Sequence, residues 1–133
     1  MDDNYEVFFH GHVPSKSSQM VIGAVLVNKG RSIDELSGAI SYEGNPSRAQ
    51  WEALIQAMHL AKKNSVKRLI MKGDSRNVIN AMNGQPTDRN FDAMDYYTLA
   101  RKTQLNFDQC FFQWIPPEKN GDAMKLAKRA LEE

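Results

Sequence analysis

The sequence has few of the features that mark disulfide-rich or membrane-spanning proteins. Its single cysteine, Cys110, cannot form an internal disulfide or supply a cluster of thiolate metal ligands. Because Cys110 is followed directly by two phenylalanines, we interpret it as a core residue. The longest apolar run, residues 20–27, falls well short of the roughly 20 residues that cross a bilayer. We therefore expect no association with a membrane.

A strong net charge is also absent. The 17 basic and 16 acidic residues leave a formal net charge of +1, so no overall field attracts a polyanion. Any binding of nucleic acid would have to come from a local patch, such as the basic residues within positions 62–76. The chain starts with Asp2 and Asp3 instead of the basic residues of a signal peptide, so we expect a cytoplasmic protein.

Length and composition predict a single soluble domain that spans residues 1–133. Hydrophobic residues make up 41% of the chain and charged residues 25%, which is close to the average for globular proteins. At this size a folded chain buries about two thirds of its unfolded surface. We find no internal repeat, low-complexity tract or linker between domains.

Three apolar and β-branched runs in the first third of the chain predict consecutive strands. They occupy residues 5–9, 20–27 and 33–42. The segments between them contain the proline, glycine, serine and asparagine residues that turns require. We therefore expect an antiparallel meander of three strands.

The hydrophobic period then changes to that of a helix. Apolar residues within positions 51–61 recur at the spacing i, i+3, i+4, i+7 of an amphipathic helix. Ser47 and Gln50 fit a capping box at its start. Residues 66–71 follow as a short strand, which the helix connects to the meander. Because such crossovers are right-handed and join parallel strands, this fourth strand should lie beside the first.

The second half of the chain predicts three more helices and one more strand. Helices are indicated over residues 74–82, over residues 91–100 and after residues 120–122, and a strand over residues 107–115. The predicted order is therefore β-β-β-α-β-α-α-β-α. This order describes an α/β protein with a mixed sheet of five strands and helices packed on it.

This order of elements, with specific residues at their ends, resembles type 1 ribonuclease H in its compact form without a basic protrusion. Residues 73–79 (GDSRNVI) are similar to the family's Asp-Ser-x-x-Val/Ile signature, and residues 49–54 (AQWEAL) to its Ala-Glu-Tyr-x-Ala-Leu helix start. Residues 8–11 (FFHG) resemble its opening Tyr-Phe-Asp-Gly strand. Residues 114–127 resemble its Trp-Val-Pro and Asn-x-x-Ala-Asp-x-Leu-Ala ending. The resemblance implies a ribonuclease H-like fold over nearly the whole chain.

The family hydrolyses the RNA strand of an RNA/DNA hybrid with two Mg²⁺ ions held by four carboxylates. The resemblance places His10, Gln50, Asp74 and Met124 at these four catalytic positions. Asp74 is the one carboxylate among them, whereas imidazole, amide and thioether groups are poor ligands for Mg²⁺. We therefore predict no tightly bound cofactor, weak Mg²⁺ or Mn²⁺ binding at Asp74, and no appreciable ribonuclease H activity.

Each of these positions also has a plainer interpretation. Asp74 suits the N-cap of the following helix, Gln50 closes the capping box, and Met124 adds apolar filling to the core. His10 and His12 lie two apart on a strand, so their side chains share a face. With Asp74 they would form a Zn²⁺ or Mn²⁺ site, although a hydrogen-bonded histidine pair is the commoner arrangement.

The family's substrate contacts are reduced in this chain. Its glycine-rich turn after the first strand is replaced by residues 14–18 (PSKSS), which contain no glycine. Its Asn-Asn pair before the catalytic helix is reduced to Asn45 followed by Pro46. The candidates that remain for contact with a sugar-phosphate backbone are Lys16, Asn45, Ser75 and Arg76.

These features favour a degenerate ribonuclease H-like protein, a pseudoenzyme that binds an RNA/DNA hybrid or duplex without efficient hydrolysis. A divergent metal-dependent endoribonuclease is an alternative, and it would recruit Glu52 and Asp122 beside His10 and Asp74. Helix geometry disfavours Glu52, since two residues turn about 200° away from Gln50. A protein-interaction module, such as a homodimer without a nucleic-acid role, is the second alternative, and the near-neutral charge is compatible with it.

Overall fold

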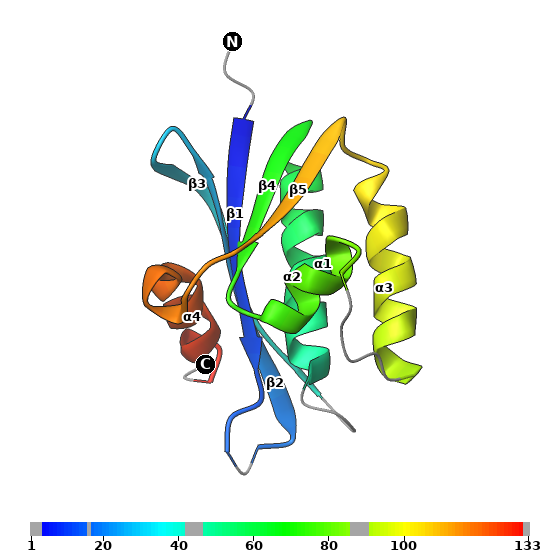
Figure 1. The fold of residues 1–133 in the computed structure, drawn as a ribbon. Coiled ribbons are helices and arrows are strands. Elements are labelled where there is room, and N and C mark those ends of the chain that lie inside the picture. The colour runs from blue at the N-terminus through cyan, green and yellow to red at the C-terminus, as the bar shows by residue number, and fades with distance from the viewer. Residues whose placement is uncertain (1–3, 16, 42–46, 86–90, 132–133) are drawn as a thin grey trace.

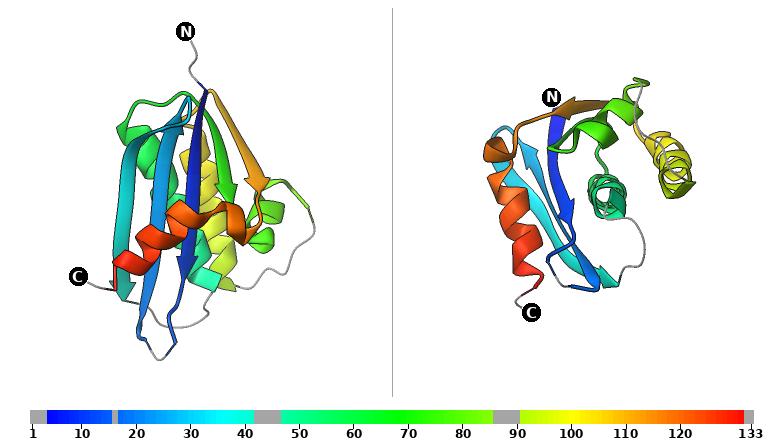
Figure 2. Two further views of the ribbon diagram at one scale, coloured as in Figure 1. Left: turned by 90° about the vertical axis from the view of Figure 1, so that its left-hand side faces the viewer. Right: turned by 60° about the horizontal axis from the view of Figure 1, so that its bottom comes forward.

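The computed structural model describes residues 4–15, 17–41, 47–85 and 91–131. In these ranges a five-stranded sheet lies at the centre, with helices on both of its faces (Figures 1 and 2). The predicted order of strands and helices is confirmed, with one added 3-10 turn, η1 (Pro117–Lys119), before the last helix. None of the described helices is long and apolar enough to cross a membrane.

The strands lie side by side in the order β3-β2-β1-β4-β5. β1 (Asn4–His12) pairs antiparallel with β2 (Gln19–Asn28), and β2 pairs antiparallel with β3 (Arg31–Ser41). On its other side β1 pairs in parallel with β4 (Arg68–Gly73), which pairs in parallel with β5 (Gln109–Trp114). The predicted meander and the predicted pairing of the first and fourth strands are both confirmed.

The helices divide between the two faces of the sheet. α1 (Ser47–Lys63) packs on one face, with α3 (Phe91–Gln104) against α1 on the same side, and α4 (Gly121–Arg129) packs on the other face (Figure 2). α2 (Arg76–Met82) directly follows β4 and packs beside β5 and α3. The apolar stripe predicted for α1 is buried against the sheet, so this helix supplies much of the core.

Two strands, β4 and β5, begin later than the sequence predicts. β4 begins at Arg68, because the amide of Val66 donates to the carbonyl oxygen of Ala61 at the end of α1, at 3.1 Å. β5 begins at Gln109, because Phe107 is still part of the turn that follows α3. Val66 and Phe107 are nevertheless buried, so their apolar character is that of core residues just outside a strand.

Cys110 lies in β5 and packs half-buried against the core. Burial raises the pKa of its thiol from 9.0 to about 12. The thiol therefore stays protonated at neutral pH and contributes to packing, as its apolar neighbours in the sequence predict.

Two glycines let a helix approach each face of the sheet closely. A Cβ at Gly11 would lie 2.1 Å from the carbonyl oxygen of Ala49 in α1, and a Cβ at Gly23 would lie 2.2 Å from that of Ala123 in α4. Because both contacts are with backbone, a change of rotamer cannot relieve them. Gly23 is the partner of His10 in the sheet, so this close packing fixes α4 beside the middle of β1.

We expect Gly23→Ala to destabilise the fold by about 2 kcal/mol, because the added methyl group would push α4 off the sheet. Chemical unfolding monitored by circular dichroism measures this change. The matched control is Gly38→Ala in β3, where the nearest atom to a new Cβ, Cγ1 of Ile22, is 3.8 Å away. Equal stabilities of the two variants would contradict this account of how α4 is held.

Candidate functional site

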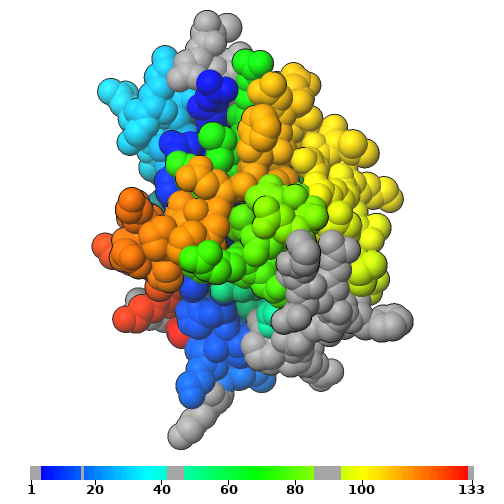
Figure 3. Space-filling view, in the orientation of Figure 1, coloured from blue at the N-terminus to red at the C-terminus, as the bar shows by residue number. Residues whose placement is uncertain are grey.

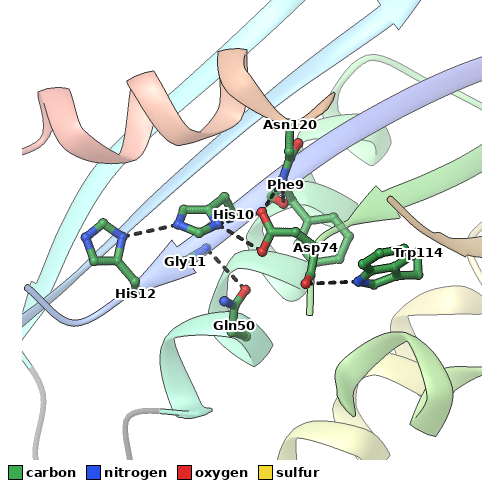
Figure 4. A network of polar contacts seen from close by, with 8 residues as sticks. All are labelled: Phe9, His10, Gly11, His12, Gln50, Asp74, Trp114 and Asn120. Carbon is green, nitrogen blue, oxygen red and sulfur yellow. Dashed lines mark hydrogen bonds and ion pairs between the residues drawn. The ribbon is translucent and has the colours of Figure 1, made fainter. Parts of the chain in front are cut away.

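The predicted site residues meet where β1 and β4 run side by side. His10 lies near the end of β1, and Asp74 directly follows β4 (Figure 4). Because the two strands are parallel neighbours, residues at their carboxyl ends are brought to the same edge of the sheet. Asn120, which directly precedes α4, completes the cluster from the face of the sheet on which α4 packs.

Asp74 is the centre of the hydrogen-bond network. Its Oδ2 accepts a bond from Nδ1 of His10 at 2.8 Å and another from Nδ2 of Asn120 at 2.7 Å. The side chain is only 5% exposed. Burial opposes ionisation, but the bonds from His10 and Asn120 outweigh it and hold the pKa of the carboxyl below its ordinary value of 3.8. The carboxylate is therefore already paired with donors from the protein.

His10 joins Asp74 to His12. The nitrogen Nδ1 of His10 faces Asp74, so it carries a hydrogen. On the other side of the ring, Nε2 lies 3.3 Å from Nδ1 of His12. Burial, with a further contribution from His10, lowers the pKa of His12 below 6.5, while Asp74 acts in the opposite direction. His12 is therefore neutral at neutral pH.

Asn120 ties α4 to both strands. Its Nδ2 donates to the carbonyl oxygen of Phe9 in β1 at 2.9 Å as well as to Asp74. The residue is 1% exposed, and its Oδ1 has no hydrogen-bond partner within the described part of the chain. A buried unpaired oxygen costs about 1–3 kcal/mol. The two donated bonds thus fix an orientation that leaves one polar atom unsatisfied.

The sequence patterns did not predict that Asn120 would bond to Asp74. There it stands only as the residue before the last helix, and its contact with Asp74 spans 46 positions. The available signal was its place in the family-like ending, which marks the position but not what the side chain contacts.

Gln50 and Glu52 leave α1 in opposite directions. The oxygen Oε1 of Gln50 accepts a bond from the backbone N–H of Gly11 at 3.4 Å, so the side chain reaches β1. Glu52 instead accepts a bond from Gln56 at 3.0 Å and lies beside Tyr96 of α3. The rotation predicted from helix geometry is confirmed, and Glu52 does not reach Asp74.

Ser75, and not Asp74, caps α2. The hydroxyl oxygen of Ser75 accepts a bond from the backbone N–H of Val78 at 3.4 Å. The interpretation of Asp74 as an N-cap is therefore wrong. Its side chain turns toward β1, and its backbone carbonyl accepts a bond from the indole N–H of Trp114 at 3.1 Å (Figure 4).

Met124 lies outside the core, so its interpretation as apolar filling is also wrong. It is 36% exposed on α4, because the buried face of this short helix is formed by Ala123, Leu126 and Ala127. Asp122 is exposed too, and it borders a different hollow together with Phe8. The side-chain hydrogen bonds of Asp74 within the described residues come from His10 and Asn120, and from neither of these two.

The proposed three-residue metal site is not formed. His10 uses one ring nitrogen for Asp74 and the other for His12, so neither is directed at a shared cation position. In the portion of the chain that the structure describes, no group of three His, Cys, Asp or Glu side chains is arranged to hold a metal ion. The two histidines form a hydrogen-bonded pair, which was the alternative interpretation.

The candidates for contact with nucleic acid divide into two groups. Lys16 and Asn45 lie outside the described residues. Arg76 is exposed at the start of α2, and its guanidinium carbon lies 3.8 Å from the centre of the Trp114 ring. Figure 3 shows the start of α2 in green beside the orange segment that follows β5, on one face of the molecule. A stacked cation therefore lies at the surface next to Asp74.

Comparison with known proteins gives a consistent result. A protein family described as reverse transcriptase-like matches residues 8–130. No curated protein matches the chain. Among solved structures, RNase H1 from the halophilic archaeon Halobacterium salinarum NRC-1 matches with a TM-score of 0.90 and 25% identity, over 97% of this chain and 98% of that one.

Two further structures match with lower identity. The N-terminal RNase H domain of a Mycobacterium tuberculosis protein, fused to maltose-binding protein, has a TM-score of 0.86 and 22% identity over 96% of this chain and 98% of that one. LC11-RNase H1 in complex with an RNA/DNA hybrid has a TM-score of 0.87 and 20% identity over 96% of both chains. These matches confirm the predicted ribonuclease H-like fold.

The lowered pKa of His12 predicts a specific loss of stability in acid. Below pH 6.5 the unfolded chain binds a proton at this position before the folded chain does, so stability falls as the pH drops through this window. We expect His12→Gln to lose less stability than the unmodified chain between about pH 7.5 and about pH 5. Thermal unfolding across this range measures the difference.

The control for this prediction is His59→Gln, which removes an exposed imidazole from α1. Its stability profile should run parallel to that of the unmodified chain. Parallel profiles for His12→Gln and the unmodified chain would show that burial of His12 has no consequence for folding.

Proposed function

The chain belongs to the reverse transcriptase-like family, and on that premise we propose that it binds an RNA/DNA hybrid or duplex by its backbone without hydrolysing it efficiently. The observation that carries this proposal is the contact of Asp74 with His10 and Asn120. The one carboxylate at the four family positions is thus already bonded within the protein. In this sense the protein is a pseudoenzyme with a ribonuclease H-like fold.

The residues at the family's four positions do not fit a pair of Mg²⁺ ions. Mg²⁺ requires a nearly octahedral shell of oxygen ligands, whereas His10 and Met124 offer nitrogen and sulfur, and the oxygen of Gln50 faces Gly11. Two such ions about 4 Å apart repel strongly and need several carboxylates nearby. A single weakly held Mg²⁺ or Mn²⁺ at Asp74 would have to compete with the N–H of His10.

The groups around Asp74 suit a phosphate backbone better than a metal pair. Arg76 is exposed and stacked on Trp114, and arginine binds phosphate oxygens through its planar N–H groups. Lys16, Asn45 and Ser75 are proposed as further contacts on the strength of their sequence positions. LC11-RNase H1, which has the same fold, was determined with an RNA/DNA hybrid bound, and this supports the same class of ligand here.

A role in protein interaction without nucleic acid is the second candidate. Phe111 lies on β5, an edge strand of the sheet, and it is 58% exposed. An exposed aromatic side chain on an open sheet edge favours association with another chain, such as a second copy in a homodimer. A divergent nuclease has less support, because Glu52 bonds to Gln56 on its own helix and Asp122 is exposed in a hollow beside Phe8.

The triple variant His10→Asp, Gln50→Glu, Met124→Asp should gain cleavage of RNA in a hybrid when Mg²⁺ or Mn²⁺ is present, while the unmodified chain has none. The variant restores the negative charge and oxygen ligands that two metal ions need. Gel analysis of a labelled hybrid measures cleavage. Adding Asp74→Asn to the triple variant should abolish it.

Cleavage by the unmodified chain would overturn this part of the proposal. If that activity disappeared in an Asp74→Asn variant of the otherwise unmodified chain, the divergent metal-dependent nuclease would replace the pseudoenzyme as the leading function.

Binding of the hybrid should depend on Arg76. We expect Arg76→Ala to weaken binding roughly tenfold and to reduce the slope of log affinity against log salt by about 1, the value for one lost phosphate contact. Fluorescence anisotropy at two salt concentrations measures both. The matched control is Lys67→Ala, which removes an exposed cation before β4, at the opposite end of that strand.

The same titration separates the two candidate functions. If the unmodified chain does not bind hybrid or duplex at low salt and elutes as a dimer in size-exclusion chromatography, the protein-interaction role is favoured instead.

A further inference from the structure

A hollow of about 350 Å³ opens between the end of β1 and α4. It adjoins the network around Asp74, yet neither the hydrogen bonds of that network nor the proposed phosphate contact of Arg76 uses its interior. Two observations, its apolar walls and its charged rim, indicate what it would bind. The residues that line it are His10, His12, Met124, Lys125, Lys128 and Leu131.

The walls of the hollow are mainly apolar. Met124 is 36% exposed and Leu131 is 45% exposed, although both are large hydrophobic side chains. The half-buried ring of His12 adds a flat surface beside them. Thioether, aliphatic and imidazole groups together suit a planar aromatic ligand such as a nucleobase.

The rim of the hollow is positively charged. Lys125 and Lys128 are both exposed and lie one turn apart on α4. No carboxylate is found among the described residues that line the hollow. The hollow at the start of α4 differs, because Glu118 and Asp122 line it. The rim between β1 and the later part of α4 is therefore complementary to an anion such as phosphate.

The ring of His12 adds a polar group to the wall of the hollow. Its Nδ1 faces His10, and its second ring nitrogen, Nε2, lies on the side away from the network (Figure 4). A single polar group in an apolar lining is typical of sites that fix the orientation of a small ligand.

We propose that this hollow binds a nucleotide. The base packs against Met124 and Leu131, its polar edge meets Nε2 of His12, and the phosphate lies between Lys125 and Lys128. A volume of about 350 Å³ is at the small end of ligand sites, which suits one nucleotide and not a longer segment. The ligand is either a free mononucleotide or an unpaired nucleotide of a bound strand, and the second source rests on the proposed function.

Isothermal titration with AMP, adenosine and inorganic phosphate tests the site on the full chain. AMP should bind more tightly than either of the others, because it alone engages both the walls and the rim. The double variant Lys125→Ala, Lys128→Ala should weaken AMP binding roughly tenfold and leave adenosine binding unchanged. The control is Lys62→Ala, Lys102→Ala, which removes two exposed lysines from α1 and α3.

A second measurement locates the ligand. In NMR spectra, AMP should shift the ring resonances of His12 and leave those of His59 unchanged, because His59 lies exposed on α1, away from the hollow. An absence of AMP binding at millimolar concentration, equal effects of the two lysine double variants, or an unmoved His12 would each overturn the proposal.

A comparison of two hybrids distinguishes the two sources of the nucleotide. If the ligand is part of a strand, a hybrid with a short single-stranded overhang should bind more tightly than a blunt hybrid, and the Lys125→Ala, Lys128→Ala variant should lose this preference. If AMP binds but the preference is absent, the ligand is a free nucleotide. Failure of both hybrids to bind while AMP binds would sink the proposed function and leave the nucleotide site standing.

Discussion

The contact between His10 and Asp74 determines what the centre of this molecule can do. Parallel pairing of β1 and β4 forces the residues at these two positions together, whatever their chemistry. Two carboxylates placed there would repel unless cations lay between them. An imidazole removes that requirement, because its N–H donates directly to the carboxylate at 2.8 Å. The carboxylate of Asp74 therefore has a hydrogen-bond donor from the neighbouring strand.

The surrounding packing reinforces this contact. Asn120 donates to Asp74 and to the backbone of Phe9, so the same carboxylate is held by β1 and by the segment that precedes α4. The absence of a side chain at Gly23 lets α4 approach the sheet closely enough for this arrangement. The orientation of Asp74 thus depends on elements from opposite ends of the chain, and it is a property of the whole fold.

The fold was predictable from the sequence because its signals are local. Hydrophobic period and turn residues indicate each element, and the right-handed crossover rule pairs β1 with β4. The side-chain contacts were less predictable. The interpretation of Asp74 as the N-cap of α2 fails because the competing donors, His10 and Asn120, come from segments far away in the sequence. Met124 was expected in the core, although three smaller neighbours on α4 already fill its buried face. The contacts of a side chain depend on which groups from distant segments pack against it, and a local sequence pattern does not contain that information.

The stacking of Arg76 on Trp114 has a practical consequence. The chain has two tryptophans, and Trp51 is buried in the core at 2% exposure. Trp114 lies under a guanidinium and donates its indole N–H to the backbone of Asp74. The surroundings of Trp114 therefore include charged and polar groups of the site, whereas those of Trp51 belong to the core. A ligand that displaced Arg76 from this ring would change the surroundings of Trp114, so tryptophan emission would report such binding without an attached dye.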